Sequence, residues 1–234
     1  WLRGRDIKRW SYDWSNLYVI VASIGVNLED YPGAFAHLLT YRDQLSARSD
    51  YHPDRMSWYH LRPCSYYDAF DKPKIVYPDI APRPQFSYEQ EQCFGGNSMY
   101  FMPTTEIYLL GFLNSKVVEF FYHHLSSSLR GGYLRFTYQY VEQIPLPDSP
   151  KFLRDRVSAI VQQCMEASKN RPTTLSALEA ELNALIYQAY GLDADDIAVI
   201  EEYLAGRSEN AAAVSSVEAD DEEDLSTRSL TGEL

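Results

Sequence analysis

Cysteine is scarce in this sequence, and the few cysteines are widely separated. Cys64, Cys93 and Cys164 are the only three in 234 residues, and no two of them form a C-x-x-C pair. An odd number of distant cysteines favours neither a disulfide framework nor a zinc site. We therefore expect reduced thiols and a cytoplasmic protein.

Several motifs that mark membrane insertion or catalysis are also missing. No stretch approaches the roughly 20 consecutive apolar residues that a membrane-spanning helix requires, so we predict no membrane partner. The sequence has no G-x-G-x-x-G or G-x-x-x-x-G-K-[ST] nucleotide loop and no G-x-S-x-G nucleophile turn. His123 and His124 are adjacent and would point about 100° apart on a helix, which does not suit a shared metal ion. We therefore assign neither catalytic nor metal-binding residues.

Lysine and arginine are also fewer than aspartate and glutamate, and they are unevenly distributed along the chain. The net charge is −12, but residues 1–150 carry 14 Lys and Arg against 16 Asp and Glu, whereas residues 151–234 carry 7 against 17. Nine of the first 14 basic residues fall in three segments, 1–10, 72–86 and 126–140. Because the local field decides whether a phosphate backbone can approach, this pattern leaves nucleic-acid binding open.

The pattern of apolar residues in the first 150 positions predicts both strands and helices. Alternating or continuous apolar residues predict strands, and apolar residues at three- and four-residue steps predict helices. Prolines in the strand candidates indicate edge strands or strand ends. Because the elements do not follow strict βαβ order, we predict an α+β fold with a mixed or antiparallel sheet. Strands are expected at 17–22, 74–80, 97–103 and 134–146, and helices at 31–48 and 105–127, the latter with Thr105 as its N-cap.

The C-terminal third has a different character. The segment PLPDSP suggests a hinge, and two amphipathic stretches, 157–165 and 175–186, predict an antiparallel helix pair. A shorter helix is expected at 193–206. The remaining residues include ADDEED and few large apolar side chains, a composition typical of disorder. We therefore divide the sequence into an α+β domain, a C-terminal helical region and an acidic, disordered tail, at 1–147, 148–206 and 207–234.

Basic residues in the first part of the chain stand next to glycine, proline or aromatic residues. Examples are RGRDIKRW at 3–10, KPKIVYPDIAPRPQF at 72–86 and LRGGYLRF at 129–136. Arginine and lysine anchor phosphates and recognise base edges, while glycine permits close approach of the backbone. Ordinary packing uses the same residues, so the pattern alone does not decide between the two roles. The candidate DNA contacts are Arg3, Arg5, Lys8, Arg9, Lys72, Lys74, Arg83, Arg130 and Arg135.

Three carboxylates offer an alternative, catalytic interpretation. Asp79 follows a proline, and Glu89 and Glu91 come shortly after it, in a spacing that resembles metal-dependent nucleases. Such sites usually place a lysine two residues after the second acid, where this sequence has Glu91. An aspartate after proline is also ordinary turn chemistry. A metal-dependent nuclease fragment therefore stays an alternative, and a subunit-docking module built on the helix pair is another.

Seven stretches of the sequence, taken in order, carry a family resemblance. They are LRGRDIKRW (2–10), PGAFAHLLTYRDQLSAR (32–48), WYHLRP (58–63), FDKPKIVYPDIAPRPQF (70–86), YLLGFLNSK (108–116), GGYLRFTYQYVEQIPLP (132–147) and LEAELNALIYQAYGL (178–192). Together they resemble the TaqI-like C-terminal specificity domain, which follows the methyltransferase domain in bacterial adenine-specific restriction-modification enzymes. The LNS helix and the strand ending in IPLP also resemble type I specificity subunits.

The resemblance implies that residues 1–147 read a short sequence in double-stranded DNA. They would present the target adenine to an active site that flips the base and methylates it with S-adenosylmethionine, in a restriction-modification or phage-defence system. That site would lie in an upstream methyltransferase domain, since the Asn-Pro-Pro-aromatic run of such enzymes is absent here. The sequence begins at Trp1 and has its first methionine at Met56, so we expect part of a longer chain. No cofactor is expected within this part.

Overall fold

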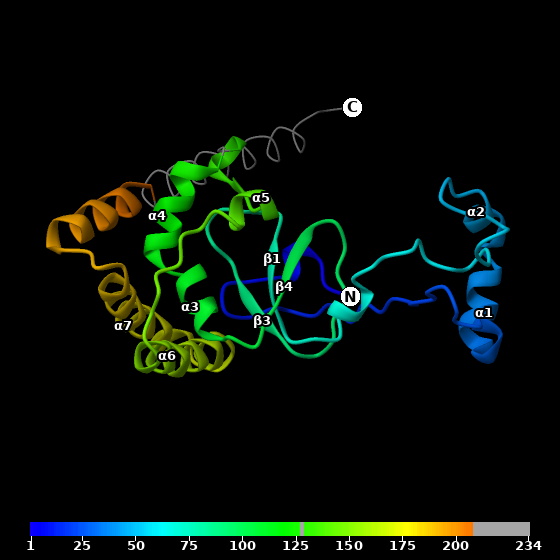
Figure 1. Cartoon of the computed structure of the whole chain (residues 1–234), viewed down its shortest axis with the longest axis horizontal. Coiled ribbons are helices and arrows are strands. Elements are labelled where there is room, and N and C mark those ends of the chain that lie inside the picture. Colours follow the sequence, from blue (N-terminus) through cyan, green and yellow to red (C-terminus); the bar gives the residue numbers. More distant parts are fainter. Residues whose placement is uncertain (127–128, 208–234) are drawn as a thin grey trace, which may run out of the picture.

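A computed structural model describes residues 1–126 and 129–207. It has a body, in which a small sheet lies against helices, and an arm that projects from the body on two connecting segments (Figure 1). The acidic tail that we predicted to be disordered lies outside the described residues from position 208 onward. No helix in the described part of the chain combines the length and the apolar character needed to cross a membrane.

Helices and short antiparallel strands occur along the same chain, so the α+β prediction is confirmed. The C-terminal region is helical, as expected, and its two long helices pack closely against each other. The strands are β1 (Lys74–Pro78), β2 (Ile80–Ala81), β3 (Ser87–Glu89), β4 (Met99–Pro103) and β5 (Leu134–Arg135). The helices are α1 (Pro32–Leu39), α2 (Arg42–Ser46), α3 (Tyr108–Leu113), α4 (Lys116–Leu125), α5 (Tyr138–Val141), α6 (Lys151–Asn170) and α7 (Pro172–Tyr190), followed by a helix over 194–207.

The main sheet has three strands in the order β3–β1–β4, and both pairs are antiparallel. β1 is central and fully buried, and its Val76 faces Ser87 of β3 and Phe101 of β4. Pro78 is the last residue of β1, so its missing N–H costs the sheet little. The proline marks a strand end and not an edge strand. β2 and β5 form a separate two-stranded ribbon.

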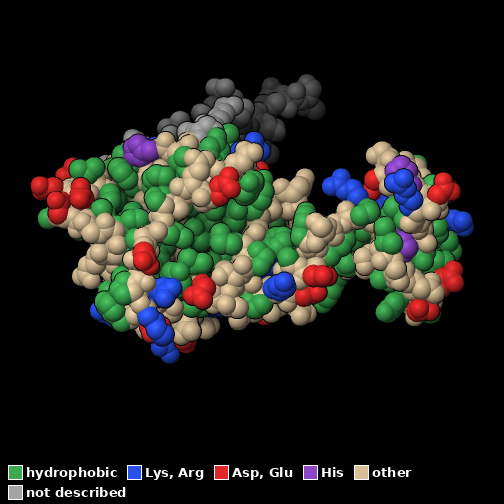
Figure 2. All heavy atoms as spheres, in the orientation of Figure 1, with side chains coloured by type: hydrophobic (Ala, Val, Ile, Leu, Met, Phe, Trp, Pro, Cys, Tyr) green, Lys and Arg blue, Asp and Glu red, His purple; other side chains and the backbone are tan. Residues whose placement is uncertain are grey.

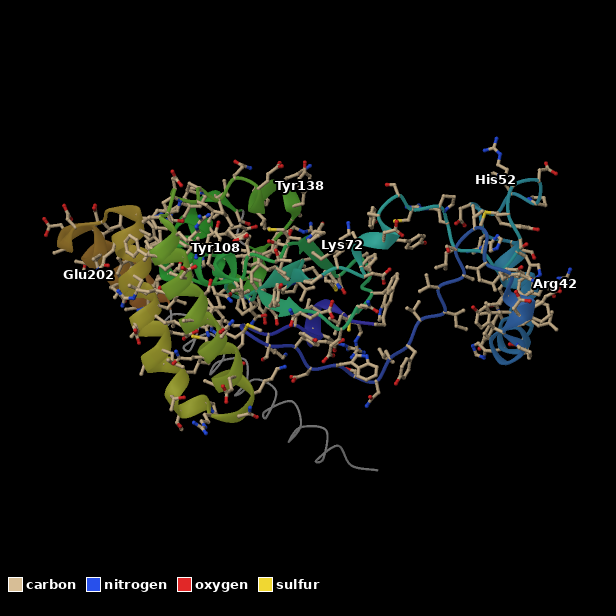
Figure 3. The ribbon with its side chains drawn as sticks, turned by 60° about the horizontal axis from the view of Figure 1, so that its bottom comes forward. Arg42, His52, Lys72, Tyr108, Tyr138 and Glu202 are labelled. Atoms are coloured by element: carbon tan, nitrogen blue, oxygen red, sulfur yellow. The ribbon has the colours of Figure 1, made fainter. Side chains whose placement is uncertain are left out.

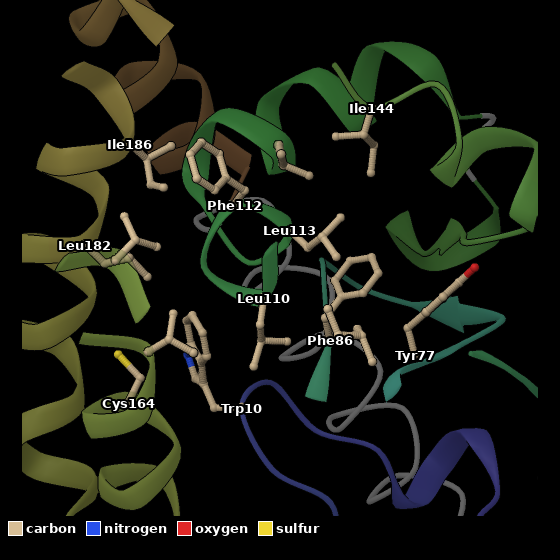
Figure 4. Close-up of a cluster of buried hydrophobic side chains, with 14 of the residues drawn as sticks. Trp10, Tyr77, Phe86, Leu110, Phe112, Leu113, Ile144, Cys164, Leu182 and Ile186 are labelled. Atoms are coloured by element: carbon tan, nitrogen blue, oxygen red, sulfur yellow. The ribbon is translucent and has the colours of Figure 1, made fainter. Parts of the chain in front are cut away.

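The hydrophobic core lies between the sheet and the helix pair (Figure 4). α3 is buried along Leu110–Leu113 and occupies the middle of this core. Tyr77 and Phe86 belong to it on the sheet side, and Cys164 and Leu182 belong to it on α6 and α7. A single core therefore spans the sheet and the C-terminal helices. The domain boundary placed after residue 147 stays a prediction.

The helix expected at 105–127 is interrupted in its middle. Asn114 turns its side-chain amide toward the backbone of Phe86, donating to its carbonyl at 2.9 Å and accepting its N–H at 3.0 Å. Ser115 then accepts a backbone N–H three residues further on and caps α4. These two polar residues end α3 and start α4. The N-cap prediction is also wrong, because α3 begins at Tyr108 and Ile107, not Thr105, occupies the N-cap position.

Three other local predictions are wrong in part. The helix expected at 31–48 is divided into α1 and α2. The strand expected at 17–22 finds no partner strand among the described residues, and its Leu17 carbonyl instead accepts from the N-terminal amine at 2.7 Å. The strand expected at 134–146 stops after two residues, because β2 offers only two partners, and α5 follows. Alternation marked apolar positions correctly, but it could not reveal the missing partner strands.

The arm comprises residues 23–60, and its two connecting segments are joined at its root. There the Leu61 N–H donates to the Ala22 carbonyl at 2.7 Å. His60 is buried inside the arm, where its Nδ1 accepts a backbone N–H and its Nε2 lies 3.0 Å from the Val26 carbonyl oxygen. α1 and α2 contain no buried residue, and the surface of the arm carries both acidic and basic side chains (Figure 2). The arm is therefore a small unit outside the main core.

Candidate nucleic-acid interface

Lys74 is a predicted DNA contact that the fold buries. Its side chain is 0% exposed, pairs with Glu89 of β3, and donates to the Phe70 carbonyl at 2.7 Å. A buried amine that is already paired has no access to a phosphate or a base edge. The structure therefore contradicts a DNA contact by Lys74. The sequence concealed this, because a strand covered on both faces buries its charged positions as well as its apolar ones.

Arg9 is also withdrawn from the surface. Its side chain is 9% exposed, and its Nε donates to Glu179 of α7 at 2.6 Å, as does the indole N–H of Trp10. Burial lowers the pKa of Arg9 from its ordinary value, against the opposing effect of Glu179. Burial acts to raise the pKa of Glu179, but Arg9 and Trp10 lower it below its ordinary value. The pair ties the N-terminal segment to α7, and the structure contradicts a DNA contact by Arg9.

Arg3 holds its guanidinium group in a fork against Asp6. Its Nε and Nη2 donate to the two carboxylate oxygens at 2.9 and 2.7 Å, and this bonding lowers the pKa of Asp6 to about 2 despite burial. Gly4, which follows Arg3, packs so closely on Ser98 that a Cβ on Gly4 would lie 2.2 Å from the Ser98 carbonyl oxygen. Arg3 thus stabilises the tight turn that carries the exposed Arg5.

The remaining predicted DNA contacts differ in side-chain exposure and in ion pairing. Arg135 is 49% exposed and lies 3.3 Å from Asp79 in an ion pair. The side chain of Arg130 is outside the described part of the structure. Lys8 lies beside Arg5 and donates to its carbonyl at 3.1 Å. Four residues are exposed and form no ion pair with the described residues: Arg5, Lys8, Lys72 and Arg83.

These cations border the sheet at both ends of β1 and do not form one patch. Arg5 and Arg135 lie at the Asp79 end, where Ser98 joins them. Its hydroxyl accepts from the turn that carries Arg5, and its carbonyl accepts from the Asp79 N–H, both at 3.0 Å. Lys72 precedes β1 at the opposite end and lies on the body, which the connecting segments separate from the arm (Figure 3). At about 3.3 Å per residue, the strand separates the two ends by roughly 16 Å.

The β2–β5 ribbon presents a mixed basic, apolar and aromatic face that our sequence analysis missed. Ile80 and Arg135 face each other across the ribbon and are exposed by 46% and 49%. Tyr133 directly precedes β5 and Tyr138 begins α5, and both are also exposed. A two-stranded antiparallel ribbon is narrow enough to enter the major groove of DNA. The sequence feature that marks this face is the alternation in YLRF (133–136). Its second and fourth residues are buried, while its first and third are exposed.

The three carboxylates of the nuclease alternative do not come together. Glu89 pairs with Lys74 at one end of β1, whereas Asp79 lies beyond the other end, about 16 Å along the strand. Among the residues that the structure describes, no three His, Cys, Asp or Glu side chains are placed to hold a metal ion. The alternative built on Asp79, Glu89 and Glu91 is therefore wrong.

The first part of the chain matches a known protein family. Residues 1–146, more than half of the chain, match the TaqI-like C-terminal specificity domain. The chain belongs to this family. The specificity domain so defined contains the sheet, the arm and the β2–β5 ribbon, and it ends shortly before α6. The helix pair beyond it still packs into the core of the specificity domain.

Curated relatives of the specificity domain are type II methyltransferases. The chain is 28% identical over 177 residues to the type II methyltransferase M.BanIII of Aneurinibacillus aneurinilyticus, covering 72% of this chain and 30% of that protein. It is 27% identical over 201 residues to M.XhoI of Xanthomonas vasicola, covering 82% and 34%. It is 23% identical over 207 residues to M.MjaIV of Methanocaldococcus jannaschii, covering 80% and 66%. The chain thus spans about a third of the length of the first two relatives.

Proposed function

We propose that this chain recognises a specific sequence in double-stranded DNA, as the specificity part of a DNA adenine methyltransferase in a restriction-modification or phage-defence system. Its membership of the TaqI-like specificity family is the observation that carries the proposal. The exposed cations at both ends of β1 support it, because they supply phosphate anchors on a chain whose net charge is −12. The β2–β5 ribbon supplies side chains of the kind that read base edges.

A second domain would perform the chemistry. The relatives are methyltransferases, and the chain corresponds to about a third of M.BanIII and M.XhoI. This chain has no glycine-rich nucleotide loop and no Asn-Pro-Pro-aromatic run. We therefore propose that S-adenosylmethionine binds in a methyltransferase domain upstream in the same chain, which acts on the adenine that the specificity domain selects.

Selection from a library of random duplexes tests the proposal. The 234-residue chain should enrich one short motif, and its binding should weaken steeply as salt is raised. Lys72→Ala should weaken binding to all duplexes alike and reduce the salt slope by about 1. Enrichment of no motif, together with salt-independent binding, would overturn the proposal.

Subunit docking is a second candidate function, and an apolar groove favours it. The groove has a volume of about 340 Å³ and lies between α4, the end of α7 and the helix over 194–207, where Val117, Phe120 and Val199 line it. Its proposed occupant is a second copy of this chain. Light scattering tests this role in the isolated chain. A stable oligomer without salt-dependent DNA binding would favour docking over DNA recognition.

A further inference from the structure

A short loop with an exposed arginine joins β2 to β3. The loop covers residues 82–86 and begins with Pro82-Arg83-Pro84, so prolines stand on both sides of Arg83. Arg83 is exposed, and its side chain forms no hydrogen bond or ion pair with the residues that the structure describes. Each proline fixes one backbone dihedral angle and reduces the freedom of the chain next to it. The backbone at Arg83 is therefore restricted before any ligand binds.

Hydrogen bonds from Arg9, the Trp10 backbone and Asn114 fix the end of this loop. The Arg9 guanidinium donates to the Pro84 carbonyl at 3.5 Å, and the Trp10 N–H donates to the Phe86 carbonyl at 3.0 Å. Asn114, which is 0% exposed, bonds both the N–H and the carbonyl of Phe86. The chain leaving Arg83 is thus fixed by groups from the N-terminal segment and from the α3–α4 junction.

One of the supporting residues, Trp10, is itself held in an uncommon backbone conformation. Trp10 is buried and has φ of 74°, in the left-handed region that residues other than glycine seldom adopt. Glu179 of α7 keeps it there, accepting from the indole N–H and from Arg9 Nε, both at 2.6 Å. Such strain persists only where the surroundings over-determine it, and it collects at functional sites. The Arg83 guanidinium lies close enough to help lower the pKa of Glu179, but it forms no hydrogen bond or ion pair with the residues that the structure describes. The support therefore fixes a loop whose exposed arginine keeps its hydrogen-bond donors available.

A rigid support suits one kind of DNA contact better than another. A phosphate contact tolerates a flexible cation, because charge alone supplies most of the interaction. Reading a guanine requires both nitrogens of the arginine fork to meet O6 and N7 in a fixed geometry. A preorganised loop lowers the ordering cost of that contact. Lysine cannot reproduce the two parallel hydrogen bonds.

We propose that Arg83 reads a guanine in the major groove, and that Arg9, Trp10, Asn114 and Glu179 are positioning residues for it. This inference rests on the proposed function, sequence-specific recognition of duplex DNA. It separates Arg83 from the exposed cations such as Lys72, which anchor phosphates. It also gives the buried Arg9, excluded as a direct contact, an indirect role in specificity.

Arg83→Lys is the decisive variant, because it keeps the charge and removes the fork. The selected duplex and versions of it with single base pairs exchanged are titrated against wild type and variant. Discrimination at one G·C pair should fall roughly 5- to 150-fold in Arg83→Lys, with discrimination elsewhere and the salt slope unchanged. Arg156→Lys, the same change at an exposed arginine on α6, is the matched control and should bind as wild type does.

Substitutions at two further positions, Pro82 and Glu179, test positioning. Pro82→Gly changes an exposed residue and loosens the loop, and it should reduce discrimination at the same G·C pair. Glu179→Gln keeps an acceptor for Trp10 and should be milder than Glu179→Ala. Combining Glu179→Ala with Arg83→Lys should cost no further discrimination than Arg83→Lys alone, which a purely structural role would not produce.

The outcomes separate this inference from the proposed function. If wild type selects a motif and Arg83→Lys keeps full discrimination, Arg83 is not a base reader and only this inference fails. Arg83→Ala weakening all duplexes alike would then identify it as a phosphate contact. If wild type selects no motif, the proposed function fails, and the inference fails with it.

Discussion

Individual charged residues in this protein take their roles from the strand or turn that carries them. Lys72 and Lys74 are two positions apart, yet the first is exposed and the second is enclosed in the sheet with Glu89. Arg3 and Arg5 differ in the same way, since Asp6 holds Arg3 in a fork while Arg5 is exposed. Burial and pairing, and not residue type, therefore decide which cations face a ligand.

Removing one partner of the buried ion pair should be costly. Lys74→Ala leaves Glu89 charged and unpaired inside the sheet, so the free energy of unfolding should fall by about 3–5 kcal/mol. The double variant Lys74→Met, Glu89→Leu removes both charges and should be less destabilising than Lys74→Ala. Urea denaturation monitored by tryptophan fluorescence measures both. Wild-type stability of Lys74→Ala would contradict the enclosed pair.

A histidine on α4 gives stability a pH dependence. Burial, with smaller contributions from Arg207 and His124, lowers the pKa of His123 from 6.5 to about 4. Between these values the unfolded chain binds the proton and the folded chain does not. The contribution of His123 is therefore complete above about pH 6.5 and is lost as the pH falls toward 4. His123→Gln should remove this part of the pH dependence, as urea denaturation across that range would show. An unchanged profile in the variant would contradict the shifted pKa.

At the scale of elements, α3 and α6 approach each other at a glycine. A Cβ on Gly111 would lie 2.8 Å from Val157 and 2.9 Å from Val161, closer than packed side chains tolerate. This glycine lets α3 sit deep between the sheet and the helix pair (Figure 4). α3 in turn leads to Asn114, which holds Phe86 and the loop before it. Helix packing therefore positions the Arg83 loop.

Two helical glycines should respond in opposite ways to the same substitution. In Gly111→Ala the added methyl group would clash with α6 and push α3 away from it, so the free energy of unfolding should fall by about 1–3 kcal/mol. Gly33→Ala, in α1, meets no atom within 4 Å and should be neutral or stabilising, since alanine favours helices. Thermal unfolding compares the two variants. Equal effects would contradict the close contact at Gly111.

How far the sequence predicted these elements depends on where each one finds its partners. The long amphipathic helices α6 and α7 and the apolar strand β1 follow directly from periodicity. The break between α3 and α4 does not follow from periodicity, because it depends on hydrogen bonds from the Asn114 side chain to the backbone of Phe86, 28 residues away in the chain. The strand expected at 17–22 has every local feature of a strand and only lacks a neighbour. Secondary-structure propensity, which is a local property, does not reveal such non-local pairings.

At the scale of the whole molecule, the arm should be separable from the body. Leu61 and Ala22 are hydrogen-bonded at its root, so their backbones are already adjacent. Replacing residues 23–60 with a short glycine linker should leave the body folded, because no residue of the arm belongs to the main core. A melting temperature close to that of the intact chain would agree with this. Loss of cooperative unfolding would contradict it.

The candidate interface was predicted in part. The family resemblance and the exposed Arg5, Lys8, Lys72 and Arg83 came from the sequence. The burial of Lys74 came only from the fold, because only the sheet order shows that β1 is central. Arg9 was misjudged for a similar reason, since Glu179 lies 170 residues away in the chain. Runs of basic residues show where charge is available, but tertiary pairing decides which charges are used.

The central claim is that this chain distinguishes one DNA sequence from another. The most direct test is the ratio of its dissociation constants for the selected duplex and a scrambled duplex of equal length, measured at one fixed salt concentration. We predict that the selected duplex binds more tightly by roughly 10³-fold or more, and that both affinities fall as salt rises. Equal affinity for the two duplexes at every salt concentration would contradict the account.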